Sequence, residues 1–222
     1  MPEKTKLLVS LGVALALAGA ASTASAAPVP LQNATATFSQ SNPCCGDIWS
    51  PRYTIDGQRS GSFVSWAPNR GDPPDFTLPE TIVWETKSDL AVNTGRPPEF
   101  GIWQEDFVPR PGHNLGRFRL SYTTYDRSLF ADGLATGGDV SANWTVIDPL
   151  TARSSTGESF TELADKSLLV SGGANTYSDY FVTAAFAATG VVTGFRLEGA
   201  GRSFIAVQRA RALRPRGVLS RL

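Results

Sequence analysis

Few residues in this chain have the types and spacing that catalysis requires. The chain has one histidine, His113, so a serine or cysteine nucleophile would have a single imidazole available as its general base. Glu105 and Asp106 would have to face one cleft to cleave a glycosidic bond, but neighbours on an extended segment point to opposite faces. The segment GESF at 157–160 lacks the second glycine of a nucleophile elbow. We therefore expect no enzymatic activity.

Metal-binding chemistry is also restricted. A zinc or iron site needs several histidine or cysteine ligands, and the only cysteines are the adjacent pair Cys44 and Cys45. A metal ion held by oxygen ligands remains possible, because the segment YTIDGQRSGSFVSWA at 53–67 places an Asp-Gly turn at Asp56 before a strand. A carboxylate with several turn carbonyls suits calcium, and an ordinary turn has the same sequence pattern. Both interpretations of Asp56 stay open.

A disulfide between the two adjacent cysteines cannot cross-link distant parts of the fold. Disulfide geometry prefers Cα atoms roughly 5.5 Å apart, whereas consecutive Cα atoms lie about 3.8 Å apart. Two free thiols in a turn and a strained vicinal bridge are both compatible with the pair Cys44–Cys45.

The first 26 residues have the pattern of an export signal. Lys4 and Lys6 precede an apolar run from Leu7 to Ala20, and Ala24-Ser25-Ala26 is a small-x-small cleavage site. The run is shorter than the ~20 residues that cross a bilayer comfortably. We expect a mature chain that begins near Ala27, has no transmembrane segment, and is secreted or held in the cell envelope.

The rest of the chain has the size of one domain. Lysine plus arginine equals aspartate plus glutamate, at 20 each, so no global field favours nucleic acid. The end of the chain differs, because the stretch from residue 200 onward is rich in arginine and has no acid. Its arginines are Arg202, Arg209, Arg211, Arg214, Arg216 and Arg221. We expect one domain over residues 27–208 and a disordered, arginine-rich tail over 209–222.

About ten short segments of alternating or β-branched residues, separated by turn residues, predict an all-β sandwich or barrel. Outside the signal peptide we expect essentially no helix; FTELADK at 160–166 could form one turn at most. Turn signals such as DPL and ADGLATGGD separate the strands. The predicted strands are residues 34–38, 61–67, 81–87, 100–104, 116–124, 143–148, 167–171, 180–187, 191–198 and 203–207.

The segment HNLGRFRLSYTT, from His113 to Thr124, shows the alternation most clearly. Phe118, Leu120 and Tyr122 should face inward, while Arg117, Arg119, Ser121 and Thr123 face outward. His113 follows a Pro-Gly turn and is interpreted as a strand-entry residue. Two guanidiniums on one face could bind carboxylates or sugar hydroxyls, but pairing with cross-strand acids is favoured.

The order of several motifs resembles the discoidin domain, also called the coagulation factor V/VIII C-type or galactose-binding-like domain. The resemblance is strongest to versions in secreted bacterial proteins of the kind that carry a PEP-CTERM sorting signal. The motifs are ATATFSQ, TIDG before a Trp-containing strand, TIVWETK, HNLGRFRLSYTTYDRSLFADGL, NWTVIDP, SLLVSGG and GFRLEG. Gln208 departs from the pattern, since it stands where such domains usually have an acid.

The resemblance implies a jelly-roll β-sandwich that is not catalytic, binds a glycan or another cell-surface ligand through its end loops, and often holds a structural calcium. Only Asp56 maps near that ion site. A mixture of aromatic, Arg and Asn side chains in or beside loops suits a polar ligand. The candidate ligand-binding residues are Trp49, Trp66, Asn69, Arg70, Arg117, Arg119, Tyr125 and Arg127. The alternative is a structural envelope or matrix protein without a small ligand.

The composition of the tail yields a prediction about stability. Burial of unpaired arginines would cost several kcal/mol per ion, so residues 209–222 should remain in water. Deletion of these residues should shift the melting temperature by no more than a few degrees, the scale of roughly 1 kcal/mol. Differential scanning calorimetry would test this, and failure of the truncated chain to fold would show that the tail is an integral strand.

Overall fold

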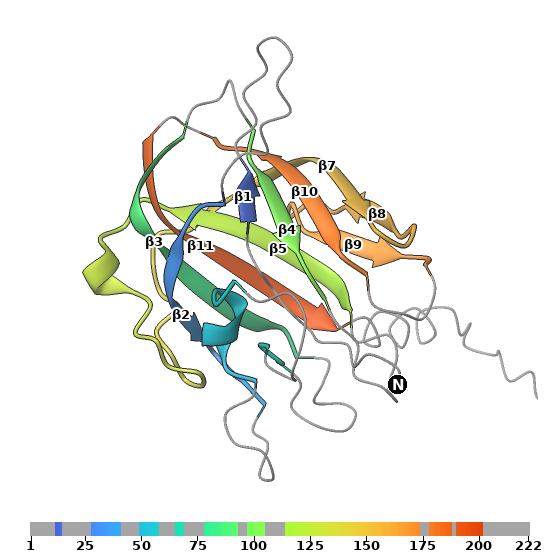
Figure 1. Cartoon of the computed structure of the whole chain (residues 1–222). Coiled ribbons are helices and arrows are strands. Elements are labelled where there is room, and N and C mark those ends of the chain that lie inside the picture. The colour runs from blue at the N-terminus through green and yellow to red at the C-terminus, as the bar shows by residue number, and fades with distance from the viewer. Residues whose placement is uncertain are drawn as a thin grey trace, which may run out of the picture.

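A computed structural model of the chain describes residues 12–14, 28–40, 49–57, 65–68, 78–92, 97–104, 114–173, 178–187 and 190–201. These residues form two antiparallel β-sheets (Figure 1). The strands are β1 (Gly12–Ala14), β2 (Leu31–Ala36), β3 (Glu80–Val92), β4 (Glu99–Ile102), β5 (Leu115–Thr123), β6 (Thr145–Val146), β7 (Asp148–Ser154), β8 (Ser159–Glu162), β9 (Leu168–Ser171), β10 (Tyr180–Ala185) and β11 (Gly190–Gly201).

The larger sheet has seven strands in the order β2-β3-β11-β5-β9-β8, with β6 paired to β5. The smaller sheet has the order β1-β4-β10-β7. Figure 1 shows the long strands β3, β11 and β5 side by side. Helical structure in the described residues is limited to the 3-10 turns η1 (Pro51–Thr54) and η3 (Arg127–Leu129). The predicted all-β architecture is therefore confirmed.

Aromatic contacts between the sheets form the core. Phe100 of β4 meets Phe195 of β11 edge to face at a centroid distance of 5.4 Å. Phe118 of β5 stacks on Tyr180 of β10 at 5.9 Å. All four side chains are buried, and aromatic side chains contribute the largest apolar areas to such a core. These contacts fix which face of each sheet points inward.

A second apolar layer covers part of the outer face of the larger sheet. Val83 of β3 packs against Phe130 and Ala131. We call residues 125–144, which carry this layer, the cover segment. The segment also protects the edge strand β2, because the N–H of Ala36 donates to the Leu134 carbonyl at 3.0 Å. Its partly buried apolar members are Tyr125, Val140, Ala142 and Trp144.

The inward and outward assignments for β5 are confirmed. Phe118, Leu120 and Tyr122 are buried on the core side. Ser121 and Thr123 lie on the outer face as predicted, yet they are also buried there. The Oγ1 of Thr123 donates to the carbonyl of Asn143 in the cover segment at 3.0 Å.

Three predictions of local structure are wrong. Residues 65–67, the described part of the predicted strand 61–67, lie outside any strand. DPL was expected to be a turn between strands, but β7 begins at Asp148, and Pro149 lies at a register shift of this edge strand, where proline is tolerated. FTELADK was expected to give at most a helical turn, but Ser159–Glu162 is strand β8 and the following residues form its hairpin turn. Pairing with β9 outweighs the weak helix propensity of so short a segment.

The strand β1 lies within the segment that the sequence assigns to the export signal. In the full chain it pairs with β4, with Gly12 opposite Gly101. Removal of the signal concerns the processed chain and stays a prediction. Several residues discussed above lie outside the described residues, as does the predicted strand at 203–207. They are Cys44, Cys45, Asn69, Arg70, Glu105, Asp106, His113 and the tail 209–222.

One glycine of β11 makes room for the cover segment on the outer face of the larger sheet. A Cβ at Gly194 would lie 2.6 Å from Cζ of Phe130 and 2.8 Å from the Trp84 carbonyl oxygen. Since that oxygen belongs to the β3 backbone, it cannot move without disturbing the sheet. Phe130 is anchored in the cover segment, so the position has no room for alanine.

Gly194→Ala should therefore lower the free energy of unfolding by about 1–3 kcal/mol. Gly190→Ala on the same strand is the matched control, because a Cβ there meets nothing within 4 Å, and its effect should stay within about 0.5 kcal/mol. Urea unfolding measures both variants. Equal stability of the two variants would refute this account of the β3–β11 packing.

Candidate functional site

Trp66 does not lie at a ligand-accessible surface. Its side chain is 1% exposed and belongs to the main core. The indole Nε1 donates to the carbonyl of Phe38 at 2.9 Å. The prediction that Trp66 contacts a ligand is wrong, because a ring enclosed by the core cannot stack on a ligand. Trp49 is partly buried just before η1.

Arg127 and Tyr125 hold the cover segment to the sheet. The Nε and Nη2 atoms of Arg127 donate to the carbonyl and the hydroxyl of Thr86, each at 2.8 Å. Nη1 pairs with Asp89 at 2.8 Å. Tyr125 packs against the second apolar cluster. Both side chains have structural partners here and lie apart from the pair Arg117 and Arg119.

Arg117 and Arg119 are brought together on the outer face of the larger sheet. Arg119 forms a forked pair with Glu198 of β11, with Nε to Oε2 at 2.8 Å and Nη2 to Oε1 at 3.1 Å. Arg117 Nη2 pairs with Oδ2 of Asp165 at 2.7 Å. Arg196 Nη2 contacts Glu198 at 3.1 Å. We call these five residues the charge cluster. The favoured expectation of a cross-strand acid is confirmed for Arg119, whereas the acid that pairs with Arg117 lies in the turn between β8 and β9.

Exposure varies across the charge cluster. The side chains of Arg117 and Asp165 are 44% and 42% exposed, whereas that of Arg196 is 17% exposed. The guanidinium of Arg196 lies 5.2 Å from the ring centroid of Trp144. Burial, aided by the like charge of Arg119, lowers the pKa of Arg196, and Glu198 opposes this effect. The Arg117–Asp165 end is therefore the part that a ligand can reach.

Ser167 organises the exposed end of the charge cluster. Its hydroxyl donates to Oδ1 of Asp165 at 2.6 Å and accepts from Nε of Arg117 at 2.9 Å. The hydrogen bond from this hydroxyl, with help from Arg117, lowers the pKa of Asp165 to about 2. Nη1 of Arg117 makes no hydrogen bond to any residue that the structure describes. At this end the ordered Asp165 carboxylate, a hydrogen-bond acceptor, lies beside Nη1 of Arg117, a donor that is available to a ligand.

The sequence predicted Arg117 and Arg119 but missed their partners. The alternation in GFRLE, where Phe195 and Leu197 face the core, would have placed Arg196 and Glu198 on the outer face. Their position opposite β5 depends on the register of β11 against β5, which pairs Glu198 with Arg119. No local pattern in the sequence gives that register.

A second polar group closes one end of the sandwich. Oε2 of the buried Glu158 accepts hydrogen bonds from the hydroxyls of Thr156 and Ser178, both at 2.8 Å. Gln104 joins it through Nε2, which donates to the Ser178 carbonyl at 2.7 Å. Burial alone would raise the pKa of Glu158, but the hydroxyl donors outweigh burial and lower it. These bonds join the segments that flank β4, β8 and β10, so Glu158 has a structural role.

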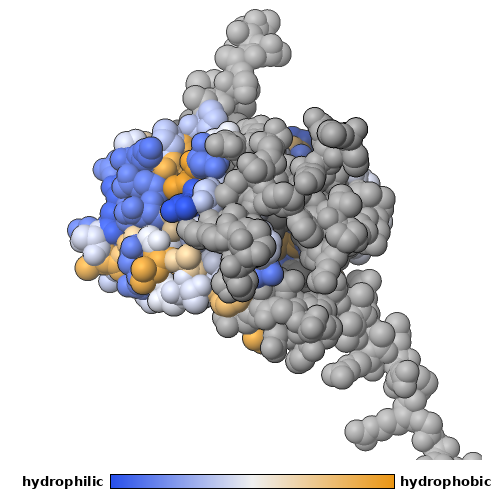
Figure 2. Space-filling model, turned by 60° about the horizontal axis from the view of Figure 1, so that its bottom comes forward, coloured by the Kyte–Doolittle hydropathy of each residue, from blue (hydrophilic) through white to orange (hydrophobic). Residues whose placement is uncertain are grey.

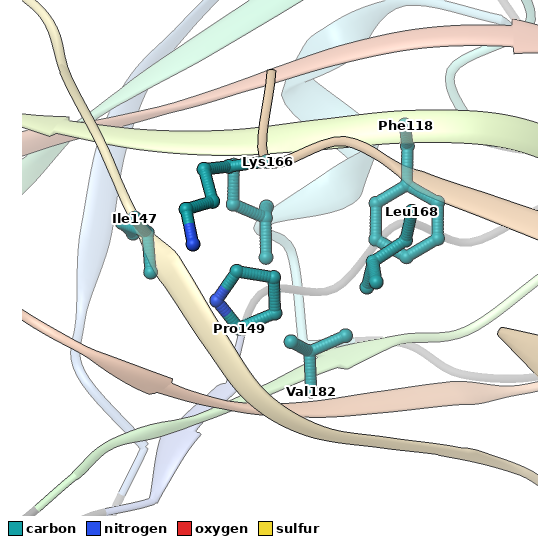
Figure 3. A pocket seen from close by; sticks show the side chains of 7 residues that line it. Phe118, Ile147, Pro149, Lys166, Leu168 and Val182 are labelled. Atoms are coloured by element: carbon teal, nitrogen blue, oxygen red, sulfur yellow. The ribbon is translucent and has the colours of Figure 1, made fainter. Parts of the chain in front are cut away.

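The crevice in Figure 3 is too small for a glycan. It has a volume of about 10 Å³ and lies between the two sheets beside Lys166. A volume of this size holds about one water molecule. The ammonium of Lys166 pairs with Asp148 at 2.6 Å and Glu162 at 2.8 Å. The side chains that line the crevice are Phe118, Leu120, Ile147, Pro149, Lys166, Leu168 and Val182.

The described part of the surface mixes apolar and polar side chains. On the face in Figure 2, apolar side chains of the described residues lie in small groups between polar ones. Large exposed apolar patches mark protein or membrane contacts; the described residues on this face present only small apolar groups. Within the described ranges no helix is long and apolar enough to cross a bilayer.

Asp56 lies at an exposed bend before Gly57, whose φ is +79°. A positive φ at the glycine agrees with the predicted Asp-Gly turn. Among the residues placed by the structure, no group of three or more His, Cys, Asp or Glu side chains could hold a metal ion. Calcium at Asp56 therefore stays a prediction.

Comparison of the chain with family models, with curated proteins and with solved structures finds no match in any of the three. The discoidin resemblance thus rests on the sequence motifs.

Replacement of Ser167 by alanine should raise the pKa of Asp165 from about 2 toward 3.8, because the largest cause of the lowered value is removed. Because the pKa of Asp165 is lower in the folded chain than in the unfolded chain, the ionised carboxylate stabilises the fold at pH values above its unfolded pKa. In the unmodified protein this stabilisation is lost as the pH falls toward 2. In the variant it is lost at a higher pH. NMR titration of the carboxyl carbon measures the midpoint. Asp126, whose pKa is lowered by Ser128, is the internal control and should not move. An unchanged Asp165 midpoint would contradict the role of Ser167.

Proposed function

We propose that this chain is an exported, non-catalytic binding module that recognises a glycan or another polyhydroxylated cell-surface ligand. The proposal includes a jelly-roll fold of the galactose-binding-like type, secretion or retention in the cell envelope, and a structural calcium at Asp56. The two antiparallel sheets and the motif order support it. The observation that carries it is the half-exposed Arg117–Asp165 pair, which is ordered before any ligand arrives.

The chemistry of this pair suits neighbouring hydroxyl groups. A sugar diol can accept a hydrogen bond from Nη1 of Arg117 and donate one to the carboxylate of Asp165. Ser167 and Arg119 already fix both groups, so little side-chain entropy is lost on binding. A shallow site of this size would bind in the millimolar range, about −4 kcal/mol per site. Trp49, Asn69 and Arg70 remain candidates for additional contacts from the predicted loops.

The second candidate function is a structural spacer in the envelope or matrix. The forked Arg119–Glu198 pair favours it, because a cross-strand pair of this geometry stabilises a sheet without any ligand. A spacer would associate with itself or with neighbouring proteins and would bind no small sugar. Sedimentation at several protein concentrations, alongside the binding test below, separates the two functions.

Arg117→Ala should weaken glycan binding about tenfold or more, because a hydrogen bond to a charged group contributes roughly 1.5–3 kcal/mol. A glycan array identifies a ligand of the unmodified protein, and calorimetry then gives the dissociation constants of both proteins. The melting temperature of the variant shows that it is folded.

Lys87→Ala is the matched control, since it removes an exposed cation from β3 of the same sheet. It should bind within about twofold of the unmodified protein, as expected for a charge outside the contact. Failure of the unmodified protein to bind any glycan on the array would refute the proposed function. Equal affinity of Arg117→Ala and Lys87→Ala would place the site elsewhere.

A further inference from the structure

The smaller sheet presents aromatic side chains on its outer face. In β4 and the residue after it, Phe100 and Ile102 are buried in the core, while Trp103 is only partly buried. In β10, Tyr180 and Val182 are buried, and Phe181 between them is partly exposed. Because successive strand residues point to opposite faces, Trp103 and Phe181 share the face away from the core.

A glycine sets the position of Trp103. A Cβ at Gly101 would lie 2.6 Å from Cη2 of the Trp103 indole and 3.0 Å from both Cζ2 and Cζ3. The six-membered ring of the indole therefore lies directly over Gly101. The missing side chain lets the ring rest on the backbone of β4.

Phe181 and Arg153 lie next to Trp103 on the outer face, on the next two strands of the smaller sheet. Gly101 pairs with Phe181, and Phe181 pairs with Arg153 of β7. The Phe181 ring stands at 87° to the Trp103 ring, with centroids 6.2 Å apart. The guanidinium of Arg153 lies 4.0 Å from the Phe181 centroid. We call Trp103, Phe181 and Arg153 the aromatic row.

Polar groups flank the aromatic row on the same face. Arg153 Nη2 pairs with Oε2 of Glu99 at 3.2 Å, and the two side chains are 60% and 35% exposed. The register places Thr183 between Glu99 and Thr151 in the neighbouring line of the sheet. Donors and acceptors thus lie beside the rings, and the opposite charges of Arg153 and Glu99 cancel.

We propose that the aromatic row is a binding site for the neutral pyranose rings of a glycan. The apolar C–H face of a sugar stacks on the exposed part of the aromatic rings, as amphipathic ligands do on Trp and Tyr. Arg153, Glu99 and the two threonines then bond the hydroxyls at the edge of the sugar. The cancelled charge favours a neutral hexose over a uronate or sulfate, because Glu99 already neutralises Arg153 and no net positive charge is left to attract an anion.

This site goes beyond the charge cluster, because it uses different residues on the opposite sheet. The two outer faces of a sandwich point away from each other, so one molecule could hold two sugar chains at once. Two weak sites that engage together give an avidity well above either affinity. The module would then bridge glycan chains.

The test uses calorimetric titration with cellohexaose and mannohexaose as neutral probes. Trp103→Ala should weaken binding of the better probe about tenfold or more, as loss of a central aromatic contact does. Gly101→Ala keeps the indole but displaces it, since the new Cβ occupies its place, and it should weaken binding in the same direction. Its fold should persist, because the indole can swing outward.

Gly190→Ala is the matched glycine control, with open space around its Cβ, and should bind like the unmodified protein. Arg117→Ala should also retain hexaose binding, while Trp103→Ala should retain the array ligand that depends on Arg117. Failure of both hexaoses to bind the unmodified protein would overturn the proposed site and leave the charge cluster untouched. Unchanged affinity of Gly101→Ala and Trp103→Ala would overturn it as well.

Discussion

The contact between the aromatic inner faces of the two sheets determines the surface chemistry of this protein. Phe100 against Phe195 and Phe118 against Tyr180 fix the inward side of β4, β11, β5 and β10. Since a strand alternates its side chains, every residue next to one of these rings must face outward. A slip of one residue in any of these strands would exchange core and surface. The outer faces are therefore as well defined as the core.

The two outer faces carry different chemistry because one of them is partly covered. The cover segment packs on Val83 and buries the middle of the larger sheet, so Arg196 is enclosed and the charge cluster opens to solvent mainly at Arg117. The outer face of the smaller sheet instead carries partly exposed rings beside a compensated ion pair. Planar charged groups on one side and aromatic groups on the other suit two kinds of contact to polyhydroxylated ligands.

Local patterns predicted the fold where alternation is strong and failed where pairing decides. The run from Arg117 to Thr123 combines strict alternation with β-formers, so its strand and both faces could be assigned from sequence. Strands β7 and β8 were missed because Pro149 and the residues of FTELADK disfavour strands locally, and only their neighbours in the sheets make them extended. The partners of Arg117 and the place of Trp103 over Gly101 depend on packing between segments that no local pattern encodes.

Mapping of the ligand contacts by NMR tests most directly whether binding uses the outer faces of the sandwich. Backbone amide shifts of the isotope-labelled protein would be followed during titration with cellohexaose and then with the array ligand. The account predicts that the hexaose moves the amides of Gly101, Phe181 and Arg153, and that the array ligand moves those around Arg117. Saturable shifts confined to residues 58–64 and 69–77, with both faces unchanged, would contradict it.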